Sequence, residues 1–134
     1  KKHHQEIQKV LEIVDMGDYK NRLIGTLSGG QQQRIFIART LISNPKIIFM
    51  DEPLVGVDVA SQEKFYTLME KLNKQLGITL VMVSHDLGVI TEYTNRVACV
   101  GNQKVFVHDS KSFNEEQYVK DVYGEKARLL HHRH

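Results

Sequence analysis

The pattern of apolar and polar positions predicts helices and strands that alternate along the chain. Apolar residues recur every three or four positions over residues 5–16, and again from about Gln31 to Ser43, which predicts two amphipathic helices. The run at 46–50 is apolar at nearly every position and has the length of a strand, so we expect it to be buried on both faces. Residues 78–84 predict a second buried strand.

A third helix is predicted between these two strands, capped at its start by Asp58 or Ser61 and broken by Gly77. Its apolar stripe consists of Phe65, Leu68, Met69, Leu72 and Leu76. We interpret this stripe as core. A strand, a helix and a strand in this order predict a right-handed βαβ unit with parallel strands.

The rest of the chain predicts a smaller set of elements. Asp86 can cap a short helix that runs through about Tyr93. Two apolar segments, 96–100 and 104–108, flank Gly101-Asn102 and predict a β-hairpin. Asn114 opens a last helical stretch, and the tail ends in three histidines and an arginine.

Composition narrows the class of protein. The 134 residues carry a net charge of +2, and the lysines are dispersed, so a nucleic-acid partner is not expected. The one cysteine, Cys99, lies in an apolar strand pattern and is expected to be a small buried hydrophobe. No apolar run has membrane-spanning length, and the first residues do not resemble a signal peptide. If this protein functions at a membrane, we expect it to do so as a peripheral subunit.

The start of the second helix has the chemistry of an anion site. Ser28 is a good N-cap, and Gln31 three residues later completes a capping box. Gly29 and Gly30 allow close approach of a ligand, and the free N–H groups of the first turn attract a phosphate. The alternative is an ordinary capped surface helix preceded by a glycine turn.

Two carboxylates, Asp51 and Glu52, follow the first buried strand, and His85 ends the second. The C-terminal ends of parallel strands are where α/β sheets bind ligands. Adjacent residues at a strand end point in different directions, so one carboxylate can face a metal and the other a nucleophile. The alternative interpretation is a pair of solvated acids and a structural histidine.

Four short motifs then connect the chain to a known family. They are LSGGQ at 27–31, IIFMDE at 47–52, GVD at 56–58 and VSHD at 83–86. In this order they resemble the signature motif, the Walker B strand with its glutamate, the D-loop and the switch-histidine segment of ATP-binding-cassette (ABC) ATPases. The order and spacing are those of the family, and the resemblance covers roughly Leu11 to His108.

The resemblance implies an α/β fold, the C-terminal part of a P-loop NTPase (RecA-like) ABC domain. Residues 1–43 would form the end of its helical subdomain with the signature motif, and residues 44–110 the RecA-like core part. Residues 111–134 would form a C-terminal helix and tail. The Walker A loop is absent from the sequence and is expected before residue 1, so we predict that this chain alone neither hydrolyses ATP nor binds it tightly.

The resemblance also implies roles for single residues. Asp51 would hold Mg²⁺, Glu52 would orient and deprotonate the attacking water, and His85 would contact the γ-phosphate. The signature residues Ser28, Gly29, Gly30 and Gln31 would contact ATP held by a second cassette in a head-to-tail dimer, although Gln31 can be occupied in its capping box. Asp58 would lie at the contact between the cassettes, a role that is compatible with capping the following helix.

Finer resemblance points to the zinc and manganese importers, as an ATPase on the cytoplasmic face of the membrane beside a permease and a substrate-binding protein. It rests on weak motifs that include Phe65-Tyr66, residues 83–90 and His108. An importer of another substrate, or a non-catalytic half-cassette that regulates a partner, are the alternatives. The histidine-rich tail is interpreted as a chain end more readily than as a metal site.

Overall fold

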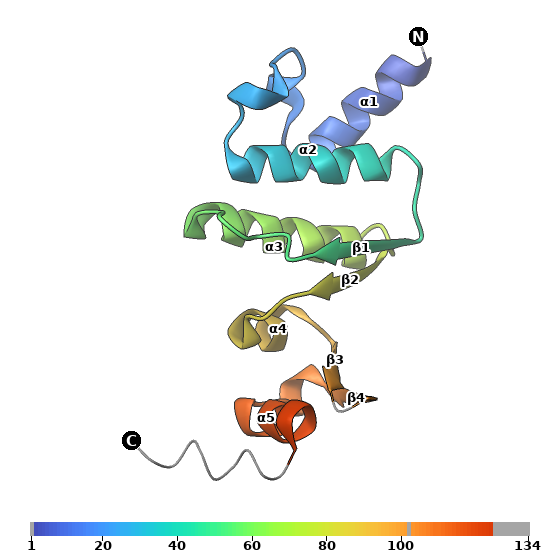
Figure 1. Cartoon of the computed structure of the whole chain (residues 1–134). Coiled ribbons are helices and arrows are strands. Elements are labelled where there is room, and N and C mark those ends of the chain that lie inside the picture. Colours follow the sequence, from blue (N-terminus) through green and yellow to red (C-terminus); the bar gives the residue numbers. More distant parts are fainter. Residues whose placement is uncertain (1, 102, 125–134) are drawn as a thin grey trace. The chain divides into compact units, whose positions relative to one another are not determined.

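The computed structural model describes residues 2–101 and 103–124 and groups the chain into two compact units, Lys1–Val83 and Ser84–His134 (Figure 1). This boundary reflects packing within each unit. The predicted limits at 43/44 and 110/111 concern family subdomains and remain a prediction. Within the described residues, no helix is both long enough and apolar enough to cross a membrane.

The first unit combines three helices with a pair of strands. Its elements are α1 (Lys2–Ile13), the 3-10 turns Gly17–Tyr19 and Ile24–Thr26, α2 (Gly29–Leu41), β1 (Ile47–Asp51), α3 (Val59–Lys74) and β2 (Thr79–Val83). The predicted cap residues start two of the helices, Ser28 at α2 and Asp58 at α3. Gly77 follows α3 with φ +65°, a conformation that favours glycine and ends the helix.

Strands β1 and β2 are parallel, in a register that runs from Ile47 opposite Thr79 to Asp51 opposite Val83. The connection between them is α3, which contacts β2. The predicted order of strand, helix and parallel strand is therefore confirmed. Helix α2 packs on α1 and on α3, as Figure 1 shows for this unit.

The core of the first unit lies between its helices. Val14, Met16 and Leu72 are the largest side chains that are fully buried. Four of the five predicted stripe residues of α3 are buried, but Leu76 is 47% exposed. The prediction for Leu76 was wrong because α3 ends at Lys74, so Leu76 lies beyond the last helical turn.

The expectation that both strands are buried, the first of them on both faces, was also wrong. In β1 only Ile48 is buried, whereas Phe49 is 72% exposed, and in β2 Val81 and Val83 are exposed. Alternate residues of a strand point to opposite faces of the sheet. Within the described residues this sheet has two strands, and only the face that carries Ile48 is covered.

The second unit contains α4 (Leu87–Tyr93), β3 (Arg96–Gly101), β4 (Lys104–Asp109), the 3-10 turn Ser110–Ser112 and α5 (Glu115–Tyr123). The predicted hairpin is confirmed, with β3 and β4 antiparallel from Arg96 opposite Asp109 to Gly101 opposite Lys104. The predicted last helix is confirmed too, and Asn114 is its N-cap.

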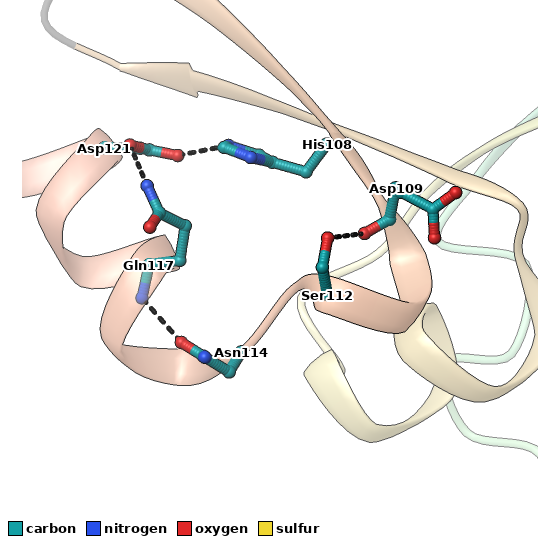
Figure 2. Close-up of polar contacts among 6 residues, drawn as sticks. All are labelled: His108, Asp109, Ser112, Asn114, Gln117 and Asp121. Atoms are coloured by element: carbon teal, nitrogen blue, oxygen red, sulfur yellow. Dashed lines mark hydrogen bonds and ion pairs between the residues drawn. The ribbon is translucent and has the colours of Figure 1, made fainter.

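A small apolar cluster holds the second unit together. Val97, Cys99 and Phe113 are buried at its centre, and Tyr118 and Val122 of α5 pack against them. Cys99 is a free, buried thiol, as the sequence predicted. Beside this cluster, His108 of β4 meets Asp121 of α5, which also accepts a hydrogen bond from Gln117 (Figure 2).

Candidate functional site

The signature turn is a fully formed capping box at the start of α2. The backbone N–H of Gln31 donates to Ser28 Oγ at 3.3 Å, and the backbone N–H of Ser28 donates to Gln31 Oε1 at 2.9 Å. The capping box predicted from the sequence is thereby confirmed. Because the Gln31 side chain is engaged in it, the polar groups that this turn can offer a phosphate are the Ser28 hydroxyl and the first N–H groups of α2.

The two glycines of the motif have different surroundings. Ser28 and Gly29 are exposed, and a Cβ atom added to Gly29 would have no atom within 4 Å. Gly30 is buried, and a Cβ atom there would lie 2.7 Å from Ser61 Cβ. The sequence pattern alone did not distinguish the two positions, because the contact comes from α3, about thirty residues further along the chain.

Asp51 and Glu52 occupy the C-terminal end of β1. Asp51 is the last strand residue and is exposed, while Glu52 is half-buried. The Glu52 N–H donates to the Val83 carbonyl at 3.0 Å and so extends the pairing with β2 by one residue. The strand end therefore presents two adjacent carboxylates, one from the ladder itself and one from the first residue after it.

Glu52 has a left-handed backbone, with φ +43°. This conformation is uncommon for a residue with a side chain and is found mainly where the surrounding structure requires it. Glu52 lies between the last strand residue, Asp51, and Pro53, where the chain leaves β1. The sequence pattern around Glu52 does not predict this conformation.

The segment after Pro53 is a tight turn that leads into α3. The Val57 N–H donates to the Leu54 carbonyl at 3.1 Å, and Gly56 has φ +75°, which only glycine adopts readily. Asp58 then caps α3, and its Oδ1 accepts from the Ser61 N–H at 3.0 Å. Hydrogen bonds from the Ser61 side chain and backbone lower the pKa of Asp58, so the cap is ionised at neutral pH.

His85 belongs to the second unit, two residues after the end of β2 in the chain, and its side chain is exposed. The neighbouring segment is ordered by local hydrogen bonds. The Asp86 N–H donates to Ser84 Oγ at 3.1 Å, and the Gly88 N–H donates to Asp86 Oδ1 at 3.0 Å. The prediction that Asp86 caps a short helix is confirmed, and the role of His85 stays a prediction.

The structure brings some of the predicted residues together. Ser28, Gly29, Gly30 and Gln31 form one turn, and Asp51 and Glu52 form one strand end. Asp58 is connected to the first of these through Ser61, which lies against Gly30 and whose N–H donates to Asp58 Oδ1. Among the described residues no group of three or more His, Cys, Asp or Glu side chains is arranged to hold a metal ion. The histidines at the end of the chain, residues 131, 132 and 134, lie outside the described part.

The sequence is similar to ATP-binding subunits of importers. A profile described as "ABC transporter" matches residues 2–55. The zinc uptake system ATP-binding protein ZurA of Listeria monocytogenes is 42% identical over 120 residues, 90% of this chain and 46% of ZurA. The zinc transport system ATP-binding protein TroB of Treponema pallidum is 40% identical over 124 residues, 92% of this chain and 46% of TroB.

Relatives with other stated substrates are similar to a comparable degree. The methionine import ATP-binding protein MetN 1 of Staphylococcus aureus is 41% identical over 120 residues, 90% of this chain and 33% of MetN 1. The chain thus spans about half the length, or less, of the curated relatives it matches.

Solved ABC cassettes share the fold. The ADP conformation of MJ1267, an ATP-binding cassette of an ABC transporter, superposes with a TM-score of 0.77 at 26% identity, over 100% of this chain and 51% of that one. The dimeric structure of MJ0796, a bacterial ABC transporter cassette, gives a TM-score of 0.66 at 33% identity, over 81% of this chain and 47% of that one. The α/β fold predicted from the sequence is that of these cassettes.

Proposed function

This chain belongs to the ABC transporter ATPase family, and from that premise we propose that it is part of the ATP-binding subunit of a zinc or manganese importer. The observation that carries the proposal is the end of β1. An exposed Asp51 and a half-buried Glu52 stand together at a strand end, which suits a site that needs one metal ligand and one base. The capped signature turn would supply a third component of the site, the groups that contact phosphate.

ATP and Mg²⁺ are the proposed cofactors, and the residues present fit them. An exposed carboxylate at Asp51 suits Mg²⁺, which prefers oxygen ligands and keeps several of its waters rather than demanding a full protein cage. When bound, the metal neutralises charge on the phosphates. Asp51 would hold it directly or through a water, and residues outside this chain would supply the cradle for the phosphates.

Glu52 is the proposed general base. Phosphoryl transfer to water needs a carboxylate within reach of the water's proton, placed apart from the metal ligand. Glu52 is the first residue after the strand and has a left-handed backbone, so it belongs to the turn and Asp51 to the strand, which supports separate roles for the two carboxylates. His85 would contact the γ-phosphate and hold the water in line.

The signature turn would act on nucleotide bound by a second cassette. Ser28 and Gly29 are exposed, and the N–H groups of α2 form the positive end of the helix dipole. A head-to-tail dimer would place this end against the γ-phosphate of the opposite subunit, with Gly30, Gln31 and Asp58 close to the contact. ABC cassettes form dimers, as the dimeric structure of MJ0796 demonstrates for that protein.

The remaining partners follow from the importer assignment. ATP-driven closure of the two cassettes would move a permease in the membrane, with this subunit peripheral on the cytoplasmic face and a substrate-binding protein on the other side. The cargo is proposed as zinc or manganese because ZurA and TroB are named for zinc. The similar identity of MetN 1 makes an importer of another substrate the alternative.

The test is the substitution Glu52→Gln in the whole protein, with Glu63→Gln as the matched control. Glu63 is an exposed residue of α3, so the control makes the same chemical change away from the site. Loss of a general base should lower ATP turnover by at least about 100-fold. Uptake of labelled zinc or manganese should be lost with it, while Glu63→Gln should match wild type in both assays.

Each other outcome contradicts a defined part of the proposal. Turnover that survives in Glu52→Gln would exclude Glu52 as the base. Turnover that is lost while the uptake of both metals continues would exclude the metal importer. A wild-type protein that binds its partners without turning over ATP would favour the non-catalytic half-cassette.

A further inference from the structure

Helices α2 and α3 meet at their first turns, at a place where one residue has no side chain. A Cβ atom built on Gly30 would lie 2.7 Å from Ser61 Cβ, 2.9 Å from Ser61 Oγ and 3.7 Å from Val57 Cγ1. Two carbon atoms at 2.7 Å are much closer than their van der Waals contact distance of about 3.5 Å. Any larger residue at position 30 must therefore push the first turn of α3 away.

Ser61 is poorly placed to yield, because the turn that carries it is anchored on both sides. Its N–H donates to Asp58 Oδ1 at 3.0 Å, and the side chain of its neighbour Gln62 donates to the Val57 carbonyl at 2.9 Å. The Gln62 N–H also donates to the Asp58 carbonyl at 2.9 Å. Moving Ser61 would disturb the cap at Asp58 and the turn at Val57 together.

The opposite side of the contact is anchored as well. Gly30 lies between Ser28 and Gln31, whose reciprocal hydrogen bonds close the capping box of α2. Gly30 is buried, while its neighbour Gly29 is exposed and would accept a Cβ atom without any contact within 4 Å. The two glycines of the motif therefore have different physical tasks.

We propose that Gly30 is a positioning residue, whose missing side chain lets the capped signature turn and the capped D-loop turn pack against each other as one rigid piece. The inference rests on the proposed function and deepens it. The absent side chain of Gly30 acts through Ser61 on Asp58 and on the exposed residues Ser28 and Gly29. This steric role is separate from any contact that the Gly30 N–H would make with nucleotide held by a second cassette. Movement at either turn is transmitted to the other within one subunit.

The test is a double-mutant cycle in the whole protein, with ATP turnover and thermal unfolding measured on every variant. Gly30→Ala should lower kcat by at least about tenfold, because the added carbon displaces the α3 turn. The KM for ATP should change by less than about threefold, because this turn does not hold the nucleotide of its own subunit. Gly25→Ala, a glycine whose added Cβ has nothing within 4 Å, should match wild type.

A second substitution at Ser61 distinguishes a positioning role of Gly30 from nonspecific destabilisation of the protein. Ser61→Gly removes the atom that conflicts, so Gly30→Ala combined with Ser61→Gly should turn over ATP within about threefold of Ser61→Gly alone. Ser61→Ala keeps the Cβ atom and should not rescue. If Gly30→Ala does not fold, Ser61→Thr adds a methyl group beside an intact Gly30 and should lower kcat in the same manner.

The outcomes distinguish this inference from the function on which it rests. A wild-type protein without ATP turnover overturns the proposed function and the inference with it. A wild-type protein that turns over ATP, together with a Gly30→Ala variant of normal kcat, overturns the inference alone. Equal rescue by Ser61→Gly and Ser61→Ala also overturns it, because the conflict would then not involve the Ser61 Cβ atom.

Discussion

The Nε2 atom of His108 lies 2.5 Å from Oδ2 of Asp121, and this pair joins strand β4 to helix α5 (Figure 2). Asp121 is only 5% exposed, and its other oxygen accepts from Gln117 Nε2 at 2.9 Å. The His108 ring packs on Phe113, with ring centroids 5.3 Å apart. A buried carboxylate is stable only when hydrogen bonds replace its water, so this pair supports the packing of α5 on the hairpin.

Removal of the His108 ring should therefore destabilise the second unit. His108→Ala takes away one hydrogen bond of a buried carboxylate and should lower the free energy of unfolding by about 1–3 kcal/mol. The measurement is urea unfolding followed by circular dichroism. His4→Ala, the same change at an exposed position of α1, should stay within about 0.5 kcal/mol of wild type. An unchanged urea midpoint in His108→Ala would show that the pair contributes nothing to stability.

Because the Cys99 thiol is buried, the free energy of unfolding should fall as the pH becomes alkaline. Burial raises the pKa of Cys99, and the negative charge of Asp121 adds to the effect. A raised pKa means that the folded state favours the neutral thiol. This stability is fully present below the unfolded-state pKa of about 8.5 and is lost as the pH rises through the folded value.

Two measurements test this prediction. The urea midpoint of wild type should fall between about pH 7.5 and pH 9.5 by more than that of Cys99→Ala, which has no thiol to ionise. A thiol-reactive dye should label Cys99 slowly in buffer and rapidly in urea. Fast labelling of the folded protein would contradict the burial of this thiol.

Asp58 should stabilise the start of α3 mainly when its carboxylate is ionised. Hydrogen bonds from the side chain and backbone of Ser61 lower its pKa below the ordinary value. A lowered pKa places this stability above the unfolded-state pKa, and it is lost as the pH falls through the folded value. Asp58→Ala should therefore lower the urea midpoint at about pH 7 and have a smaller effect at about pH 2.5.

Asp58→Asn is the matched control, because an amide oxygen also accepts from the Ser61 N–H and needs no charge. Its urea midpoint at neutral pH should lie much closer to wild type than that of Asp58→Ala. If both variants lose the same stability at both pH values, the contribution comes from packing rather than from the ionised cap.

A side chain at position 101 should lower the free energy of unfolding, because the backbone of α5 lies against Gly101. A Cβ atom at Gly101 would lie 2.6 Å from Val122 Cα and 2.9 Å from the Val122 carbonyl oxygen. Backbone atoms cannot rotate away as a side chain can, so Gly101→Ala should cost about 1–3 kcal/mol in urea unfolding. Val100→Ala, on the exposed neighbour, is the control and should cost less. A Gly101→Ala variant of wild-type stability would contradict the observed packing of α5.

The features that the sequence predicted well depend on atoms close together along the chain. The caps at Ser28, Asp58 and Asn114 involve residues three positions apart, so the side chain and the N–H that it accepts from are both visible in the sequence. The parallel pairing of β1 and β2 followed from the order of strand, helix and strand along the chain. The hairpin followed from its turn residues.

Other features depend on which segments pack against each other, and local patterns do not contain that information. The apolar run around Phe49 predicts a core residue, but Phe49 is exposed because no element in the described part of the chain covers its face of the sheet. Gly29 and Gly30 are identical in the sequence, and only the position of Ser61 gives them different tasks. The left-handed backbone of Glu52 is likewise a tertiary feature, since the surrounding structure must stabilise a conformation that the residue by itself disfavours.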